Sequence, residues 1–266
     1  MQNPTKQMLD LAQIVLEAGV VIMEIYESDF ETIIKNDETP VTKADMEAET
    51  VILARLKQLD GETPVIAEEA VAGGKIPKAA PRFYLVDPVD GTKEFINRNG
   101  EFTVNIGLIE NGVPVCGVVF APAIKRMFIG AKGHGAFEAY LTVEQRLDEA
   151  TWQPIKALHV PTGDVGGGVV GVASRSHRDE QTEKWLAERG VEKIVSAGSS
   201  LKFCLVAAGE AHLYPRFGRT MEWDTAAGHG VVLGAGGQVV TENGEPLLYG
   251  KEHRGFDNPA FFASAS

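Results

Sequence analysis

Two long apolar runs with a tight turn between them constrain the fold of this chain more than any other feature. The runs, 102–109 and 113–120, flank Glu110-Asn111-Gly112, and the Asn-Gly pair is a strong signal for a short hairpin turn. The pattern predicts two paired antiparallel strands, with more strand to about Ala139. We therefore expect the first half of the chain to contain an antiparallel sheet.

The second half shows a different pattern, in which short apolar strands alternate with helices. We predict strands at 169–173, 193–196, 211–215 and 238–241, and helices at 178–189, 201–208 and 225–233. Such alternation indicates a layered α/β arrangement. The length suits one large domain or two modest ones that share an interface, and we predict an α+β domain over residues 1–150 and an α/β domain over residues 151–266.

Two helices and three strands are expected ahead of the hairpin. Apolar residues recur at three- and four-residue steps from Met8 to Tyr26, which predicts an amphipathic helix from about Thr5 to Ser28. A second helix is expected to end at about Leu59. Short strands are predicted at 31–35, 64–67 and 83–86.

The charge balance excludes one class of function. The chain has 37 acidic and 25 basic side chains, a net charge of −12. This argues against a protein that coats nucleic acid by neutralising its phosphates. A small anionic substrate stays compatible with the balance, provided that local basic groups or bound cations reverse the field.

The cysteines and the N-terminus bear on the compartment. Cys116 and Cys204 both lie in apolar contexts, so we expect buried thiols rather than a redox or zinc motif. The first residues lack the basic and apolar blocks of a signal peptide. No apolar stretch approaches the ~20 residues that a spanning helix needs. We expect an intracellular protein with no integral membrane contact.

The segment Asp87-Pro88-Val89-Asp90-Gly91-Thr92 carries the strongest chemical signal. It follows an apolar strand and places two carboxylates three residues apart. Pro88 fixes one backbone angle between them, and Gly91 permits a tight turn. Carboxylates beside free backbone N–H groups suit a site for Mg²⁺ and phosphate. The alternative, for the hexapeptide alone, is a structural turn in which an Asp side chain caps the next helix.

Other carboxylates lie at the ends of neighbouring elements. Glu68 follows an apolar strand, Asp45 lies at the start of the second helix, and Asp224 precedes a later helix, where it can serve as the N-cap. If Glu68, Asp87, Asp90 and Asp224 converged without cations, they would repel one another strongly. Bound metal is the simplest explanation for such a convergence, which spacing alone does not establish.

With these acids in place, the sequence resembles the lithium-sensitive, Mg²⁺-dependent phosphatase superfamily that includes inositol monophosphatase. The motif at 87–92, the upstream Glu68 and the later Trp223-Asp224 carry this resemblance. Within the superfamily, the chain is similar to bacterial 3′(2′),5′-bisphosphate nucleotidases of sulfate assimilation. That similarity rests on SRSH at 174–177, GSSLKF at 198–203 and YPRFG at 214–218.

The resemblance implies a fold, an activity and a partner. The fold is a layered αβαβα sandwich with the site in the cleft between its halves. The activity is Mg²⁺-dependent hydrolysis of adenosine 3′,5′-bisphosphate to AMP and phosphate, so the partner is a small nucleotide and not a nucleic acid. The compartment is the cytoplasm. Some bacterial relatives are peripheral at the inner face of the cell membrane, but we see no basic amphipathic helix for that contact. The oligomeric state stays open.

The resemblance also implies two or three Mg²⁺ ions. The expected ligands are four carboxylates and one main-chain carbonyl, namely Glu68, Asp87, the carbonyl of Val89, Asp90 and Asp224. Asp45, Thr92 and Glu68 are the expected catalytic residues, and Asp45 with Thr92 would orient and deprotonate a water for attack. A bound divalent ion lowers the pKa of water toward neutrality, and a metal pair clamps the attacking and leaving oxygens in line.

The same carry-over defines a substrate pocket. Its expected residues are Glu68, Val89, Asp90, Gly91, Thr92, Ser174, His177, Ser199, Lys202, Arg216 and Asp224. Lys202 and Arg216 would meet the phosphate that is not cleaved, because a guanidinium forks onto phosphate oxygens and an ammonium supplies a point charge. Without the resemblance, His177 would be an ordinary loop histidine and Lys202 a snorkelling lysine.

Two other functions stay open. One is the same chemistry on inositol monophosphate or a sugar bisphosphate; a monophosphate has no second anion for Lys202 and Arg216 to grip. The other is a metal and nucleotide binder that has lost turnover. The second predicts damage among the metal-binding and water-activating side chains, and all six are intact: Asp45, Glu68, Asp87, Asp90, Thr92 and Asp224.

Overall fold

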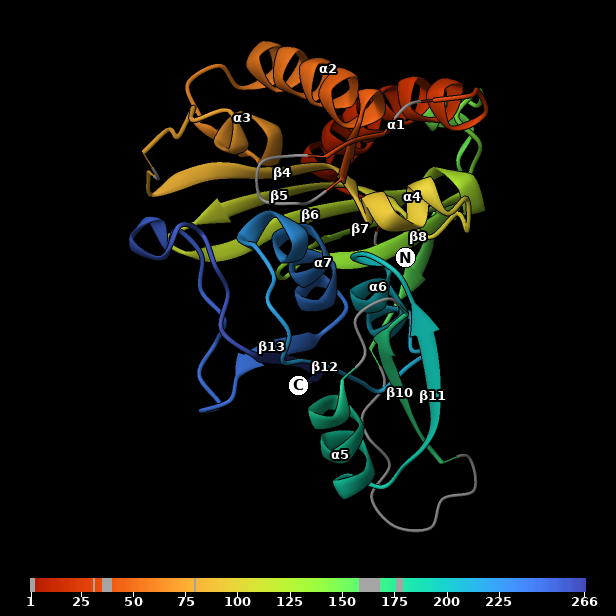
Figure 1. Cartoon of the computed structure of the whole chain (residues 1–266), viewed down its shortest axis with the longest axis vertical. Coiled ribbons are helices and arrows are strands. Elements are labelled where there is room, and N and C mark those ends of the chain that lie inside the picture. The colour runs from red at the N-terminus through yellow and green to blue at the C-terminus, as the bar shows by residue number, and fades with distance from the viewer. Residues whose placement is uncertain (1–2, 31, 35–39, 79, 158–167, 176–178) are drawn as a thin grey trace.

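The computed structural model describes residues 3–30, 32–34, 40–78, 80–157, 168–175 and 179–266. Helices and sheets alternate in five layers, in the order helix, sheet, helix, sheet, helix (Figure 1). The predicted αβαβα sandwich is therefore confirmed. No helix in these ranges is both long and apolar enough to cross a bilayer.

The first sheet has seven strands in the order β3-β4-β5-β6-β7-β8-β9. The strands are β3 (Val65–Ala67), β4 (Arg82–Asp90), β5 (Thr103–Glu110), β6 (Val113–Ala121), β7 (Arg126–Ala131), β8 (Gly135–Tyr140) and β9 (Gln153–Ile155). Only β3 and β4 run parallel, and β4 to β9 pair antiparallel. Asn111 and Gly112 both have positive φ, as a tight hairpin turn requires. The predicted hairpin is confirmed.

Two long helices cover one face of this sheet. They are α1 (Lys6–Tyr26) and α2 (Lys43–Leu59), and each begins with a threonine whose hydroxyl accepts a main-chain N–H of the first turn, at Thr5 and Thr42. Their apolar faces close one core against the sheet. Around them lie β1 (Thr32–Ile34) paired with β2 (Pro40–Thr42), α3 (Glu68–Ala72) and α4 (Thr92–Ile96).

The opposite face of the first sheet is covered by α6 (Leu201–Ala207) and α7 (Glu222–Gly234). A glycine on β6 lets α7 lie directly on the strands, since a Cβ built on Gly117 would meet the Ala227 carbonyl oxygen at 2.0 Å. No other residue fits this approach. The helix layer buries a second core between the two sheets.

The second sheet has five strands in the order β11-β10-β12-β14-β13. The strands are β10 (Val169–Ser174), β11 (Val191–Ala197), β12 (Leu213–Arg216), β13 (Gly237–Thr241) and β14 (Phe261–Ala265). The helix α5 (Glu180–Glu188) packs on the outer face. Short 3-10 helices lie at η1 (Pro122–Ile124), η2 (Leu147–Glu149) and η3 (Glu252–Arg254).

The structure corrects three expectations. The strand predicted at 83–86 continues as β4 to Asp90, with an irregularity in its pairing between Asp87 and Asp90. The helix predicted from residue 225 begins at Glu222, so Asp224 lies in the first turn and is not the N-cap. The strand β14 was not predicted, although it lies inside the second sheet. The division at residue 150 stays a prediction. Strand β9 lies beyond that residue and pairs with β8 of the first sheet.

Candidate active site

The end of β4 presents two carboxylates to one pocket. The strand's pairing with β5 is broken between Asp87 and Asp90, and Gly91 then turns the chain with φ +89° into α4. Only glycine adopts that angle without strain. A pocket of about 470 Å³ opens here between the two sheets, and Asp87, Asp90, Gly91 and Thr92 all line it.

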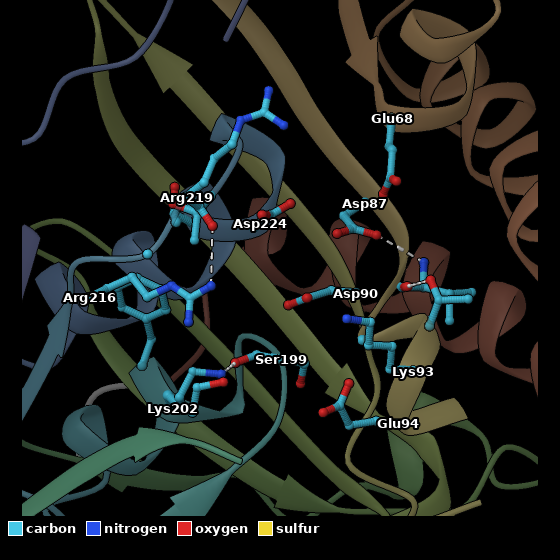
Figure 2. Close-up of a pocket in the computed structure, with 18 of the residues that line it drawn as sticks. Glu68, Asp87, Asp90, Lys93, Glu94, Ser199, Lys202, Arg216, Arg219 and Asp224 are labelled. Atoms are coloured by element: carbon cyan, nitrogen blue, oxygen red, sulfur yellow. Dashed lines mark hydrogen bonds between the residues drawn. The ribbon is translucent and has the colours of Figure 1, made fainter. Parts of the chain in front are cut away.

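Two further acids reach the same pocket from other elements. Glu68 comes from the first residue of α3, and Asp224 from the first turn of α7 (Figure 2). Burial raises the pKa of Asp87 well above its ordinary value, and the neighbouring carboxylates, Glu68 first, raise it further. Burial followed by the charges of Asp90 and Glu68 raises the pKa of Asp224 in the same way. Four acids are thus held together against their own repulsion.

This donor set fits a hard divalent cation. All the donors are oxygens, and a cation would relieve the repulsion that raises the pKa of Asp87 and Asp224. Over the ranges that the structure describes, no three His, Cys, Asp or Glu side chains are placed to hold a metal ion as they stand. The carboxylates therefore share a pocket without forming a closed ligand cage.

Asp45 and Thr92 meet beside the acids. Asp45 is buried in the first turn of α2, where its Oδ2 accepts the N–H and the hydroxyl of Thr42, both at 2.7 Å. Thr92 Oγ1 lies 3.3 Å from Asp45 Oδ1 and 3.3 Å from the carbonyl oxygen of Val89. The capping contact fixes one oxygen of Asp45 and turns the other toward Thr92 at the pocket wall.

The opposite wall is basic. Lys202 on α6 is 5% exposed, and its Nζ donates to the carbonyl oxygen of Ser199 at 2.6 Å. Burial lowers the pKa of Lys202 to about 8, against the opposing attraction of Asp90. Arg216 at the end of β12 donates from Nη2 to the carbonyl oxygen of Arg219 at 3.2 Å, while its buried Nε has no hydrogen-bond partner among the described residues. A buried donor without a partner suits an anion in the pocket.

Comparison with known proteins identifies the family. A family model described as the inositol monophosphatase family matches residues 5–260. The chain belongs to the inositol monophosphatase family. Members of this family are metal-dependent phosphatases, which agrees with the oxygen donors in the pocket.

Individual relatives are similar over nearly the full length. The chain is 43% identical over 260 residues to the 3′(2′),5′-bisphosphate nucleotidase CysQ of Escherichia coli K12, covering 97% of this chain and 99% of the relative. It is 40% identical to the CysQ of Buchnera aphidicola, covering 99% and 96%. Among solved structures, CysQ of Bacteroides thetaiotaomicron gives a TM-score of 0.79 at 38% identity, covering 97% of each chain. The Thermotoga maritima IMPase, at 24% identity and a TM-score of 0.75, supports the fold.

Most of the predicted site residues of this family member share the pocket. Those that line it are Glu68, Asp87, Val89, Asp90, Gly91, Thr92, Ser174, Ser199, Lys202, Arg216 and Asp224. Asp45 reaches the site through Thr92. The Ser199 hydroxyl donates to the carbonyl oxygen of Glu101 at 2.7 Å, so it is already used within the protein. His177 lies outside the described residues. The roles of all these residues stay predictions.

Sequence reasoning missed several side chains of the pocket. They are Lys93, Glu94, Phe203, Tyr214, Gly218, Arg219, Thr220 and Thr225. Phe203, Tyr214 and Gly218 lie inside the motifs GSSLKF and YPRFG, and Lys93, Arg219 and Thr225 each follow a recognised motif directly. Their proximity to those motifs was the available signal, but nothing in their spacing distinguished pocket residues from core residues.

Proposed function

We propose that this member of the inositol monophosphatase family is a Mg²⁺-dependent 3′(2′),5′-bisphosphate nucleotidase. In this proposal it hydrolyses adenosine 3′,5′-bisphosphate to AMP and phosphate. The observation that carries the proposal is a single pocket with carboxylates on one wall and Lys202 and Arg216 on the other. The 43% identity to curated bisphosphate nucleotidases over nearly the whole chain supports it.

The acidic wall suits the phosphoryl group that is cleaved. Glu68, Asp87, Asp90 and Asp224, with the carbonyl oxygen of Val89, would hold two or three Mg²⁺ ions. Bound Mg²⁺ would supply charge neutralisation at the phosphoryl oxygens and favour ionisation of a nearby water.

The chain's own groups would place the reactants. Asp45 and Thr92 are hydrogen-bonded to each other, and we propose that they orient the attacking water and take up its proton. The main-chain N–H groups of Gly91 and Thr92 belong to the same wall, where they can donate to the developing charge on the phosphoryl oxygens. Holding water and phosphate in one geometry supplies much of the rate enhancement.

The basic wall suits the phosphate that stays on the nucleotide. Arg216 has a buried Nε without a described partner, and Lys202 is almost fully buried with its ammonium at the pocket. Burying either cation is costly unless an anion pairs with it. A second phosphate would provide that anion, whereas a monophosphate would not. Ser174, Ser199 and His177 complete the proposed nucleotide pocket.

The experiment that tests this function is a comparison of substrates. Phosphate release is measured from adenosine 3′,5′-bisphosphate, inositol 1-phosphate and fructose 1,6-bisphosphate, with Mg²⁺ and then with EDTA. We expect fast release from the nucleotide alone, dependent on Mg²⁺, with AMP as product. A preference for inositol or sugar phosphate would overturn the pocket assignment. No release from any of the three would point to the binder that has lost turnover.

The physiological role follows from the substrate. Adenosine 3′,5′-bisphosphate is the by-product of sulfate assimilation, so the proposed reaction recycles it. We propose a cytoplasmic enzyme that acts on the free nucleotide. Lithium sensitivity is expected from the family resemblance, and inhibition by LiCl in the same assay tests it.

A further inference from the structure

Ser200 bonds to two acidic residues that come from opposite halves of the chain, to the carboxylate of one and the main chain of the other. Its main-chain N–H donates to Asp90 Oδ2 at 2.5 Å, and its hydroxyl donates to the main-chain carbonyl oxygen of Asp224 at 2.6 Å. Asp90 ends β4 of the first sheet, and Asp224 lies in the first turn of α7. One residue thus fixes the end of β4 against the start of α7.

Asn105 on β5 completes this bridge. Its Nδ2 donates to Asp90 Oδ2 at 3.1 Å and to Ser200 Oγ at 3.0 Å. The side chain is fully buried, and its Oδ1 has no hydrogen-bond partner in the described part of the chain. An unpaired buried carbonyl destabilises a fold, so a leucine would suit the core better at this position. The two hydrogen bonds that Asn105 donates offset the destabilisation from its unpaired oxygen.

The bridge leaves one oxygen of Asp90 for the pocket. The hydrogen bonds to Asp90 from Ser200, Asn105 and, at 3.4 Å, Thr103 all end on Oδ2. Oδ1 is therefore the oxygen that a cation can take, and Figure 2 shows the Asp90 carboxylate pointing into the pocket toward the Asp224 side. Fixing one oxygen of a carboxylate orients the other, which is how outer partners tune metal sites.

We infer that Ser200 and Asn105 are positioning residues that set the placement of Asp90 relative to Asp224, and through it the affinity of the pocket for a divalent cation. The inference rests on the metal part of the proposed function. It goes beyond the proposed ligands, because neither side chain contacts the pocket itself. This role, and not packing, explains why a buried asparagine with an unpaired oxygen occupies position 105.

The decisive variant is Asn105→Leu, which keeps the number and branching of the side-chain heavy atoms and removes both donors together with the unpaired oxygen. The full-length protein is stripped with EDTA and dialysed, and Mg²⁺ alone is titrated in by calorimetry. We expect the dissociation constant for Mg²⁺ to rise about 10- to 100-fold, the usual effect of losing an outer partner of a metal ligand. The melting temperature of the metal-free variant should equal or exceed that of the wild type.

A second variant and a control complete the experiment. Ser200→Ala keeps the N–H that Asp90 accepts and loses only the hydroxyl, so a smaller rise in the dissociation constant is expected; it carries the test if Asn105→Leu does not fold. The matched control is Thr182→Val, a buried hydroxyl on α5 at the far side of the second sheet. Its dissociation constant should equal that of the wild type.

The outcomes separate this inference from the proposed function. A lower melting temperature with unchanged Mg²⁺ affinity in both variants would make the residues merely structural and overturn the inference. A wild-type protein that binds no Mg²⁺ would overturn it together with the metal part of the proposed function. A wild type that binds Mg²⁺ but releases no phosphate would overturn the proposed function, while the ratio of Mg²⁺ affinities would still decide the inference.

Discussion

The two walls of the pocket are built in different ways. On the acidic wall, Asp87, Asp90 and Thr92 come from six consecutive residues at the end of one strand. On the basic wall, Lys202 comes from α6 and Arg216 from β12, which meet only in the folded chain. The acidic wall therefore combines one short segment of the chain with Glu68 from α3 and Asp224 from α7, whereas the two cations of the basic wall share no segment at all.

The walls also differ in how burial affects their charges. Burial and mutual repulsion raise the pKa of Asp87 and Asp224, so a bound cation would stabilise their ionised forms. Burial lowers the pKa of Lys202 to about 8, so a bound anion would stabilise the protonated form of this side chain on the basic wall. A metal-loaded bisphosphate would satisfy both walls at once. Substitutions on either wall, and in the packing around α7, test this difference.

The largest effect is expected at the acidic wall. Asp90→Asn should lower kcat by more than about 100-fold, because outer partners of metal ligands already cost 10- to 100-fold and this residue is a proposed ligand. In EDTA its melting temperature should match or exceed that of the wild type, since one of four repelling acids is gone. Steady-state assay and thermal unfolding measure the two effects. Asp148→Asn on the exposed η2 is the control, and wild-type rate in a well-folded Asp90→Asn protein would refute the metal assignment.

The next largest effect is expected where α7, the helix with Asp224 in its first turn, packs on the first sheet. Gly117→Ala should destabilise the protein by about 3 kcal/mol, because the new Cβ would meet the Ala227 carbonyl oxygen at 2.0 Å. Chemical denaturation measures this. Gly73→Ala, with its nearest contact at 3.3 Å and an ordinary φ, is the tolerant control. Equal stability of the two variants would show that α7 does not lie directly on β6.

The basic wall is tested by substrate choice. Lys202→Ala should raise KM for adenosine 3′,5′-bisphosphate about 10- to 100-fold, the worth of a hydrogen bond to a charged group, with a much smaller effect on a nucleoside monophosphate. KM values for both substrates are compared in wild type and variant. An equal change for the two would show that Lys202 does not contact the second phosphate.

The smallest effect lies on α7, away from both walls. Burial lowers the pKa of His229 to about 3, and its Nδ1 lies 3.1 Å from the Tyr249 hydroxyl. The unfolded chain binds a proton at about pH 6.5 and the folded chain does not. This stability is therefore fully present well above pH 6.5 and is lost as the pH falls, by about 1.4 kcal/mol between pH 8 and pH 5.5. Denaturation at the two pH values measures this loss. A His229→Gln protein with an unchanged pH dependence would contradict the assignment.

Local signals explain which elements could be predicted. The helices α1 and α2 and the β5–β6 hairpin follow from apolar periodicity and an Asn-Gly turn, which act over a few residues. β14 has only a weak signal, because Phe261 and Phe262 favour a strand but the Ala and Ser residues that follow them do not, and its partners β12 and β13 lie elsewhere in the chain. The start of α7 was misplaced because Asp224 suits an N-cap equally well; in the fold its Oδ2 instead accepts the Met221 N–H at 2.9 Å.

The amino-acid sequence alone specifies the pattern of helices and strands and the kinds of group that the site contains, namely carboxylates in a strand-end motif and a lysine and an arginine in recognised motifs. Which of these groups share a pocket, and which residues hold them in place, depends on how the folded layers pack. The bond from the Ser200 N–H to Asp90 spans 110 residues, and the unpaired oxygen of Asn105 appears only when the core closes around it. Contacts of this range leave no periodic pattern in a sequence, because they arise from the packing of whole layers.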